Sequence, residues 1–155
     1  AGQLDIDAWQ AAVSNDITDY TRQMAVAGAG TLPNAQVQQV AAQEIANQTP
    51  FLAGFAAAVA AGGMSVAAIA ARTKLYGGAA WRTFFRAQGS TAGEYVIERW
   101  ISRDDNRVCS LCAPRHGQTY LPGIGPMPGD CLGICRCERV QVVDREQWQR
   151  LTGRR

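Results

Sequence analysis

Apolar residues in the first part of the chain recur at intervals of three and four positions. The series runs through Ile6, Trp9, Val13, Ile17, Tyr20 and Met24. Because an α-helix turns about every 3.6 residues, these side chains share one face over about five turns. Asp5 precedes the series as a candidate N-cap, and the glycine-containing segment 27–30 follows it. We therefore predict a first helix between these two signals.

Helical periodicity continues to about residue 87 and is interrupted twice. We expect a second helix over Pro33–Gln48, since proline is tolerated in the first turn of a helix. Thr49-Pro50 is predicted to end that helix, because proline inside a helix lacks the backbone N–H donor. Two further helices are predicted over residues 51–61, which are rich in alanine, and over residues 65–87, where Ser65 is the candidate N-cap.

The pattern changes beyond residue 88, where Gln88-Gly-Ser-Thr91 separates two halves of the chain. Residues 95–101 and 139–143 are rich in β-branched and aromatic side chains, which favours a pair of strands. Residues 117–121 are predicted to add a short strand. Asp144, with Gln147 three positions later, is typical of the start of a last short helix, which Gly153 ends.

These patterns predict an α+β fold in two parts. Residues 1–88 form a helical region of about four helices. Residues 89–155 form a small β-hairpin module, clamped by a cysteine cluster and followed by a short C-terminal helix. The chain has 155 residues, of which 47% are hydrophobic and 18% charged, so it is not of the disordered class.

Charge is distributed unevenly along the chain. Residues 1–70 carry five acids and one base (net −4), whereas residues 71–155 carry fourteen bases and eight acids (net +6). All but one of these bases are arginines, whose planar groups suit carboxylate and phosphate oxygens. The basic half is therefore a candidate for contact with nucleic acid or with an acidic protein face.

Residues 45–71 contain no charged side chain, which raises the question of a membrane span. The stretch is mostly alanine, however, and alanine contributes little to membrane insertion. We expect no membrane association and predict instead that these helices present small side chains that pack closely on one another or on a neighbouring subunit.

Five cysteines lie between residues 109 and 137, and none lies elsewhere. Cys109 and Cys112 form one pair, and Cys131, Cys135 and Cys137 follow after a spacer of eighteen residues. Two short cysteine-bearing turns separated by a loop are typical of a structural zinc site, which needs four ligands in a tetrahedron. We predict a zinc ion held by four of these five residues.

The cysteines have other interpretations, among them a redox-active Cys109–Cys112 pair, which the surrounding sequence does not favour. A disulfide framework is the main alternative, although the number of cysteines is odd. The thiols could also be reduced and without a role. His116, the only histidine, could replace one cysteine as a metal ligand.

Two segments carry a resemblance to a known family. Residues 72–81, with the sequence RTKLYGGAAW, resemble a helix of the phage minor head proteins, the head morphogenesis family typified by the F protein of phage Mu. Similar C-terminal features are Trp100, an aspartate at 104 or 105, Cys109, Cys112, Gly117, the segment 122–125, Cys131 and the tripeptide Cys135-Arg136-Cys137. Many members have a histidine where this chain has Leu132. The resemblance covers roughly residues 70–143.

The resemblance implies a structural role in the virion of a tailed phage. Such proteins are minor components of the capsid interior, present in multiple copies, associated with the portal or the major capsid protein and made in the host cytoplasm. They act in head assembly and are thought to contact packaged DNA. No enzymatic activity is expected, because the chain has one imidazole and because Asp104, Asp105 and Asp130 are more typical of turn caps than of magnesium ligands.

A nucleic-acid-binding zinc module is the alternative function. In that hypothesis five arginines near the cysteines neutralise phosphates, and Trp100 and Trp148 could stack on bases. The five are Arg103, Arg107, Arg115, Arg136 and Arg139.

Overall fold

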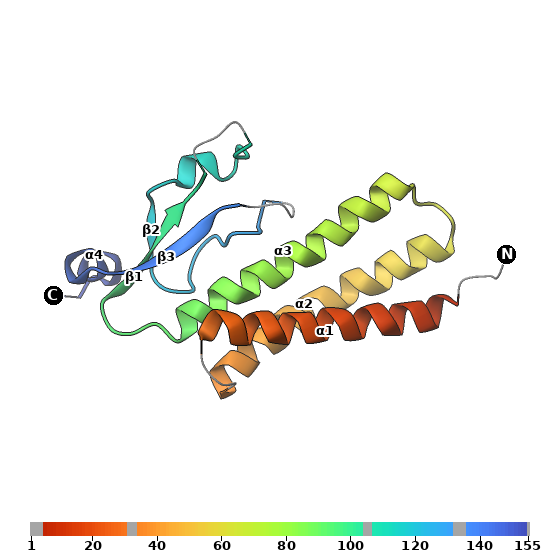
Figure 1. Ribbon diagram of the computed structural model, residues 1–155, viewed down its shortest axis with the longest axis horizontal. Coiled ribbons are helices and arrows are strands. Elements are labelled where there is room, and N and C mark those ends of the chain that lie inside the picture. Colours follow the sequence, from red (N-terminus) through yellow and green to blue (C-terminus); the bar gives the residue numbers. More distant parts are fainter. Residues whose placement is uncertain (1–4, 31–33, 104–106, 132–135, 155) are drawn as a thin grey trace.

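The computed structural model describes residues 5–30, 34–103, 107–131 and 136–154. Three long helices are followed by a three-stranded sheet and a short helix, and this confirms the predicted α+β class (Figure 1). The elements are α1 (Ile6–Ala29), α2 (Ala35–Ala60), α3 (Val66–Ser90), β1 (Val96–Ile101), a 3-10 turn (Ala113–Arg115), β2 (Thr119–Tyr120), β3 (Glu138–Val143) and α4 (Arg145–Thr152). We call the part from Val96 to Thr152 the β module.

Side-chain caps fix where the long helices begin. Asp5 accepts a hydrogen bond from the Ala8 amide at 3.0 Å, and Ser65 accepts one from the Ala68 amide at 3.2 Å, as predicted. The second helix is capped by Asn34, which sequence reasoning did not single out. Pro33, the predicted first residue of that helix, lies outside the described residues.

The predicted break at Thr49-Pro50 is wrong, because α2 runs through Pro50 without interruption. The helical region therefore contains three helices instead of about four. An internal proline costs about 3 kcal/mol of helix stability. Beyond it, however, Leu52 and Phe55 are each only 3% exposed, and burying such side chains contributes about 1.5–3 kcal/mol apiece. Tertiary packing on both sides of Pro50 thus outweighs the local penalty.

The three long helices lie side by side, with α1 in contact with both of the others (Figure 1). Their core is built largely from small side chains and includes Ala25, Ala41 and Ala87 around Val37. A close approach lies at Gly28 of α1, where an added Cβ would overlap the backbone carbonyl of Phe84 on α3. Small residues therefore set the distance between α1 and α3.

We expect Gly28→Ala to lower the free energy of unfolding by about 1–3 kcal/mol, because a methyl group there must displace the backbone of α3. Urea denaturation followed by circular dichroism measures this. Gly54→Ala is the matched control, since Gly54 lies in α2 with open space around it and alanine favours a helix there by up to about 1 kcal/mol. Equal effects at the two sites would contradict the close approach.

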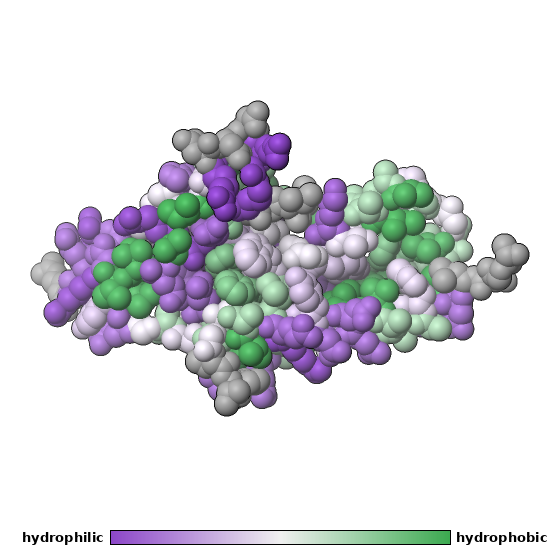
Figure 2. Space-filling model, viewed as in Figure 1, coloured by the Kyte–Doolittle hydropathy of each residue, from purple (hydrophilic) through white to green (hydrophobic). Residues whose placement is uncertain are grey.

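No helix in the described ranges has the length and apolarity needed to cross a bilayer. The uncharged stretch covers the second half of α2 and includes the tip of the helical region, where α2 ends and α3 begins. Figure 2 shows hydrophobic side chains gathered at that tip, and Val66 there is 83% exposed.

The sheet has the strand order β2-β1-β3, and all neighbouring strands are antiparallel. The predicted pairing of residues 95–101 with 139–143 is confirmed, with Val96 opposite Val143 and Ile101 opposite Glu138. Asp144 caps α4 by accepting a hydrogen bond from the Gln147 amide at 2.9 Å, and Gly153 ends the helix in the left-handed conformation, both as predicted.

Candidate metal site

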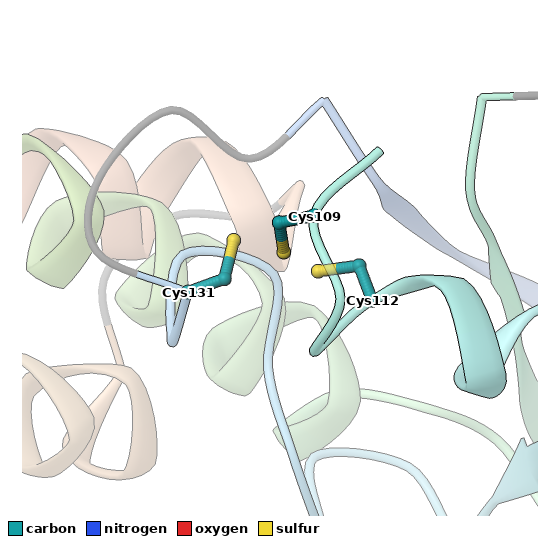
Figure 3. A group of neighbouring side chains, drawn as sticks. All are labelled: Cys109, Cys112 and Cys131. Atoms are coloured by element: carbon teal, nitrogen blue, oxygen red, sulfur yellow. The ribbon is translucent and has the colours of Figure 1, made fainter. Parts of the chain in front are cut away.

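Cys109 and Cys112 lie on a tight turn directly before the 3-10 turn. The amides of Cys112 and Ala113 both donate to the Cys109 carbonyl at 3.0 Å. This hydrogen bonding closes the backbone and brings the two cysteine side chains to the same side of the turn (Figure 3). The spacing of two intervening residues produces the geometry that the sequence predicted.

Cys131 approaches this turn from the end of the loop that follows β2. The sulfur atoms of Cys109, Cys112 and Cys131 all lie within 4.8 Å of one another and point into a common space (Figure 3). In a tetrahedral zinc site with bonds of about 2.3 Å, thiolate sulfurs are about 3.8 Å apart. A small inward movement of the three side chains would reach that geometry. The cluster can therefore hold a metal ion.

Hydrogen bonds in the turn favour the ionised form of Cys109. Burial alone would raise the pKa of this thiol, but hydrogen bonds from the Cys112 and Cys131 thiols, and from the backbone amides of Cys112 and Leu111, together lower it. The thiolate is the form of cysteine that binds metal. These donors therefore favour the form of Cys109 that a metal ion would bind.

Of the remaining two cysteines, the structure describes Cys137 but not Cys135. Cys137 is buried just before β3 and packs with Trp100 and Cys112, but its sulfur is not one of the three that lie mutually close. Cys135 lies outside the described residues. Among the described residues, Cys109, Cys112, Cys131 and Cys137 form no disulfide with one another.

His116 does not belong to the group of ligand atoms among the described residues. Its Nδ1 accepts a hydrogen bond from the Ser102 amide at 3.2 Å and lies 3.1 Å from the Ser102 hydroxyl. Because a backbone amide can only donate, this nitrogen serves as an acceptor. The histidine joins the end of the 3-10 turn to the residue after β1.

Two of the nucleic-acid candidates are wrong. The Arg139 side chain is 0% exposed and forms an ion pair with the equally buried Glu98 at 2.9 Å, so it cannot reach a phosphate. Trp100 is also 0% exposed and cannot stack on a base.

The other candidates lie nearer the surface. Arg115 is half-buried, with its guanidinium 5.2 Å from the centre of the Trp100 ring. Arg103 is exposed and 3.7 Å from the Glu138 carboxylate, and Arg107 and Arg136 are exposed as well. Trp148 packs edge-on against Tyr95.

Of the three aspartates that the sequence predicted to be turn caps, the structure describes Asp130. Asp130 accepts a hydrogen bond from the Met127 amide at 2.6 Å, which is the turn-cap role expected of it. Asp104 and Asp105 lie outside the described residues.

A buried ion pair shapes the loop that leads to Cys131. Besides Glu98, Arg139 donates to the carbonyls of Ile124 at 3.0 Å and Leu121 at 3.2 Å, and Glu98 accepts from the Gly123 amide at 3.2 Å. Burial raises the pKa of the Glu98 carboxyl and lowers the pKa of the Arg139 guanidinium, although each charge attracts the other. Desolvation therefore outweighs the attraction within the pair.

Sequence reasoning missed this pair, although strand alternation offered a signal for it. Glu98 lies between Val96 and Trp100 on one face of β1, and Arg139 stands opposite Trp100 in the register. Both buried charges thus lie on the inward-facing side of the sheet.

The β module is seated on α3 by backbone contacts. An added Cβ at Gly89 would overlap the backbone of Gly123, so the loop after β2 lies directly against the helix. The Gln141 side chain also donates to the Gln88 carbonyl at 2.9 Å. The cysteine cluster is therefore attached to the helical region through this loop.

Comparisons of the chain with protein-family models, curated proteins and solved structures found no match. The fold and the cluster define a small α+β protein in which three cysteines, contributed by two loops of the β module, form a candidate metal site.

Proposed function

We propose that this protein is a non-enzymatic interaction protein whose β module is held in shape by one zinc ion. The observation that carries the proposal is the convergence of the Cys109, Cys112 and Cys131 sulfurs to within 4.8 Å of one another. Three thiols in this arrangement favour zinc over harder cations such as magnesium and calcium. In the proposal the fourth ligand comes from Cys135 or Cys137.

The size of the β module gives the metal a structural purpose. Two of its strands have six residues and the third has two, which is little material for an independent core. Structural zinc contributes about 10–16 kcal/mol in peptide systems, compared with about 5–15 kcal/mol for the net stability of a domain. An ion bound at the cluster would join the turn before the 3-10 helix to the loop that rests on α3.

For the biological setting, we propose a minor head protein of a tailed phage, bound to the portal or the major capsid protein. The support is the resemblance of residues 72–81 and of the cysteine-bearing segment to that family. In the structure these two segments touch, because an added Cβ at Gly129 would lie 2.5 Å from the Gly78 carbonyl oxygen. They thus form one continuous unit, as a shared role in docking requires.

The test measures binding of the zinc-loaded protein to purified portal and major capsid proteins and to duplex DNA. We expect binding to a head protein whose affinity changes only a few-fold between about 50 and 200 mM salt. If instead the three exposed arginines at 103, 107 and 136 neutralise phosphates, DNA affinity is expected to fall about fortyfold over that range. DNA binding of that kind without head-protein binding would overturn the proposal in favour of the nucleic-acid alternative.

A further inference from the structure

A small cavity of about 190 Å³ lies beside the cysteine loop, between α2 and α3. Its wall includes Arg72, Leu75, Tyr76 and Arg82 from α3, Phe51 from α2, and Asp130 next to Cys131. Arg72, Leu75 and Tyr76 belong to the helical segment that the sequence singled out and that the metal site leaves unexplained.

The charges around this cavity do not balance. Glu44 is buried and accepts hydrogen bonds from Arg82 at 2.9 Å and from Arg86 at 3.0 Å. Arg82 also lies 3.7 Å from the Asp130 carboxylate. The two positive charges of Arg82 and Arg86 are therefore balanced by the two carboxylates of Glu44 and Asp130. Arg72 is half-buried and has no carboxylate partner within the described ranges, which leaves one positive charge at the cavity wall.

A hydrogen-bond donor lies beside this charge without an acceptor. The Tyr76 hydroxyl is buried and has no hydrogen-bond partner among the residues that the structure describes. Burial raises the pKa of this hydroxyl, an effect that the nearby Arg72 charge opposes, so the group stays protonated and able to donate. A buried donor left unsatisfied is unfavourable, because it has lost its hydrogen bond to water without gaining another. An acceptor carrying negative charge would satisfy the tyrosine and the arginine together.

The size and lining of the cavity indicate the kind of acceptor. Cofactor and drug-sized ligands occupy pockets of about 300–1,000 Å³, so this cavity suits a group no larger than an amino-acid side chain. Phe51 at the cavity is 57% exposed and Leu75 is half-buried, and an inorganic anion would gain nothing from either. A peptide that carries an acidic residue would use both the polar and the apolar wall.

We propose that this cavity receives an Asp or Glu side chain of a protein partner, with the carboxylate bound by Arg72 and the Tyr76 hydroxyl and with the adjoining peptide against Phe51 and Leu75. The inference rests on the proposed role as an interaction protein, but it depends neither on the metal nor on the identity of the partner. A guanidinium and a hydroxyl that converge on one carboxylate form charge-assisted hydrogen bonds, which are roughly twice as strong as neutral ones.

The test is a titration of the isotope-labelled full chain with acetyl-glutamate amide, with the neutral acetyl-glutamine amide and with inorganic phosphate, followed by NMR. We expect saturable shifts at the Arg72 side chain with the glutamate probe and about tenfold weaker binding of the glutamine probe. Arg72→Gln should weaken glutamate binding at least tenfold, and Tyr76→Phe, which removes only the hydroxyl, about three- to tenfold.

Lys74→Gln is the matched control, because it removes the same charge from an exposed position of α3 two residues away. It should leave binding unchanged. Equal losses in Lys74→Gln and Arg72→Gln, tighter binding of phosphate than of glutamate, or the absence of saturation would each overturn the assignment. The amide spectrum of each variant would establish whether it folds. Retained binding of a head protein without any probe binding would overturn the cavity assignment and leave the proposed function intact.

Discussion

Replacement of Cys131 by serine is expected to remove bound metal from the protein and to unfold the β module, while the three long helices remain folded. In the proposed zinc site, Cys131 is the ligand that joins the loop on α3 to the Cys109–Cys112 turn. Because structural zinc contributes about 10–16 kcal/mol in peptide systems, its loss exceeds the stability that so small a module can supply. Metal content per chain and dispersion of the amide spectrum measure the two effects.

The control for this substitution lies in the same turn. Ser110 is exposed and separates Cys109 from Leu111, so Ser110→Ala should retain one zinc per chain and a dispersed spectrum. Chelation of the wild-type protein should reproduce the spectrum of Cys131→Ser, and added zinc should reverse it only in the wild type. A fully loaded, folded Cys131→Ser variant would contradict the assignment of Cys131 as a ligand, and a folded variant without metal would show that the β module does not need the ion.

Arg139→Met is expected to lower the free energy of unfolding by about 3–5 kcal/mol. The substitution leaves Glu98 as a buried charge without its cation, and removing one partner of a buried pair costs that much. It also removes the donor from the carbonyls of Leu121 and Ile124. Urea denaturation of the zinc-loaded protein measures the change. Arg99→Met is the control, because Arg99 is exposed on the other face of β1 and should cost less than about 0.5 kcal/mol.

The double variant Glu98→Leu/Arg139→Met should cost clearly less than the sum of the two single substitutions. Burial shifts the pKa of each partner toward the neutral form, which indicates that desolvation of the pair is not fully repaid by its attraction. An apolar pair avoids that desolvation, and such replacements are often neutral. Strictly additive costs would show that the two side chains act independently.

The helices were predictable because their information is local. A cap at Asp5 or Ser65 and an apolar stripe lie within a few residues of one another, and the structure confirms both caps. The predicted break at Pro50 was wrong because continuation of the helix depends on the burial of Leu52 and Phe55, which arises from partners distant in sequence. Local propensity is reliable only where tertiary packing does not oppose it.

The cysteine turn was likewise predictable, since Cys109 and Cys112 are three positions apart and one backbone turn aligns them. The burial of Arg139 was not. An arginine near a cysteine cluster is expected to be exposed to solvent. Arg139 is buried because β3 pairs with β1, which places its side chain against Glu98. The cavity at Arg72 was equally hidden, because it combines side chains from α2, α3 and the loop before Cys131.

The buried Glu44 carboxylate has a consequence for how the helices find their alignment. The helices α2 and α3 are rich in alanine, so few large side chains fix the position of α2 along α3. Only one alignment places Glu44 between Arg82 and Arg86, and any other strands a charge in the interior. The carboxylate therefore favours the observed position of α2 along α3 over positions shifted by a turn.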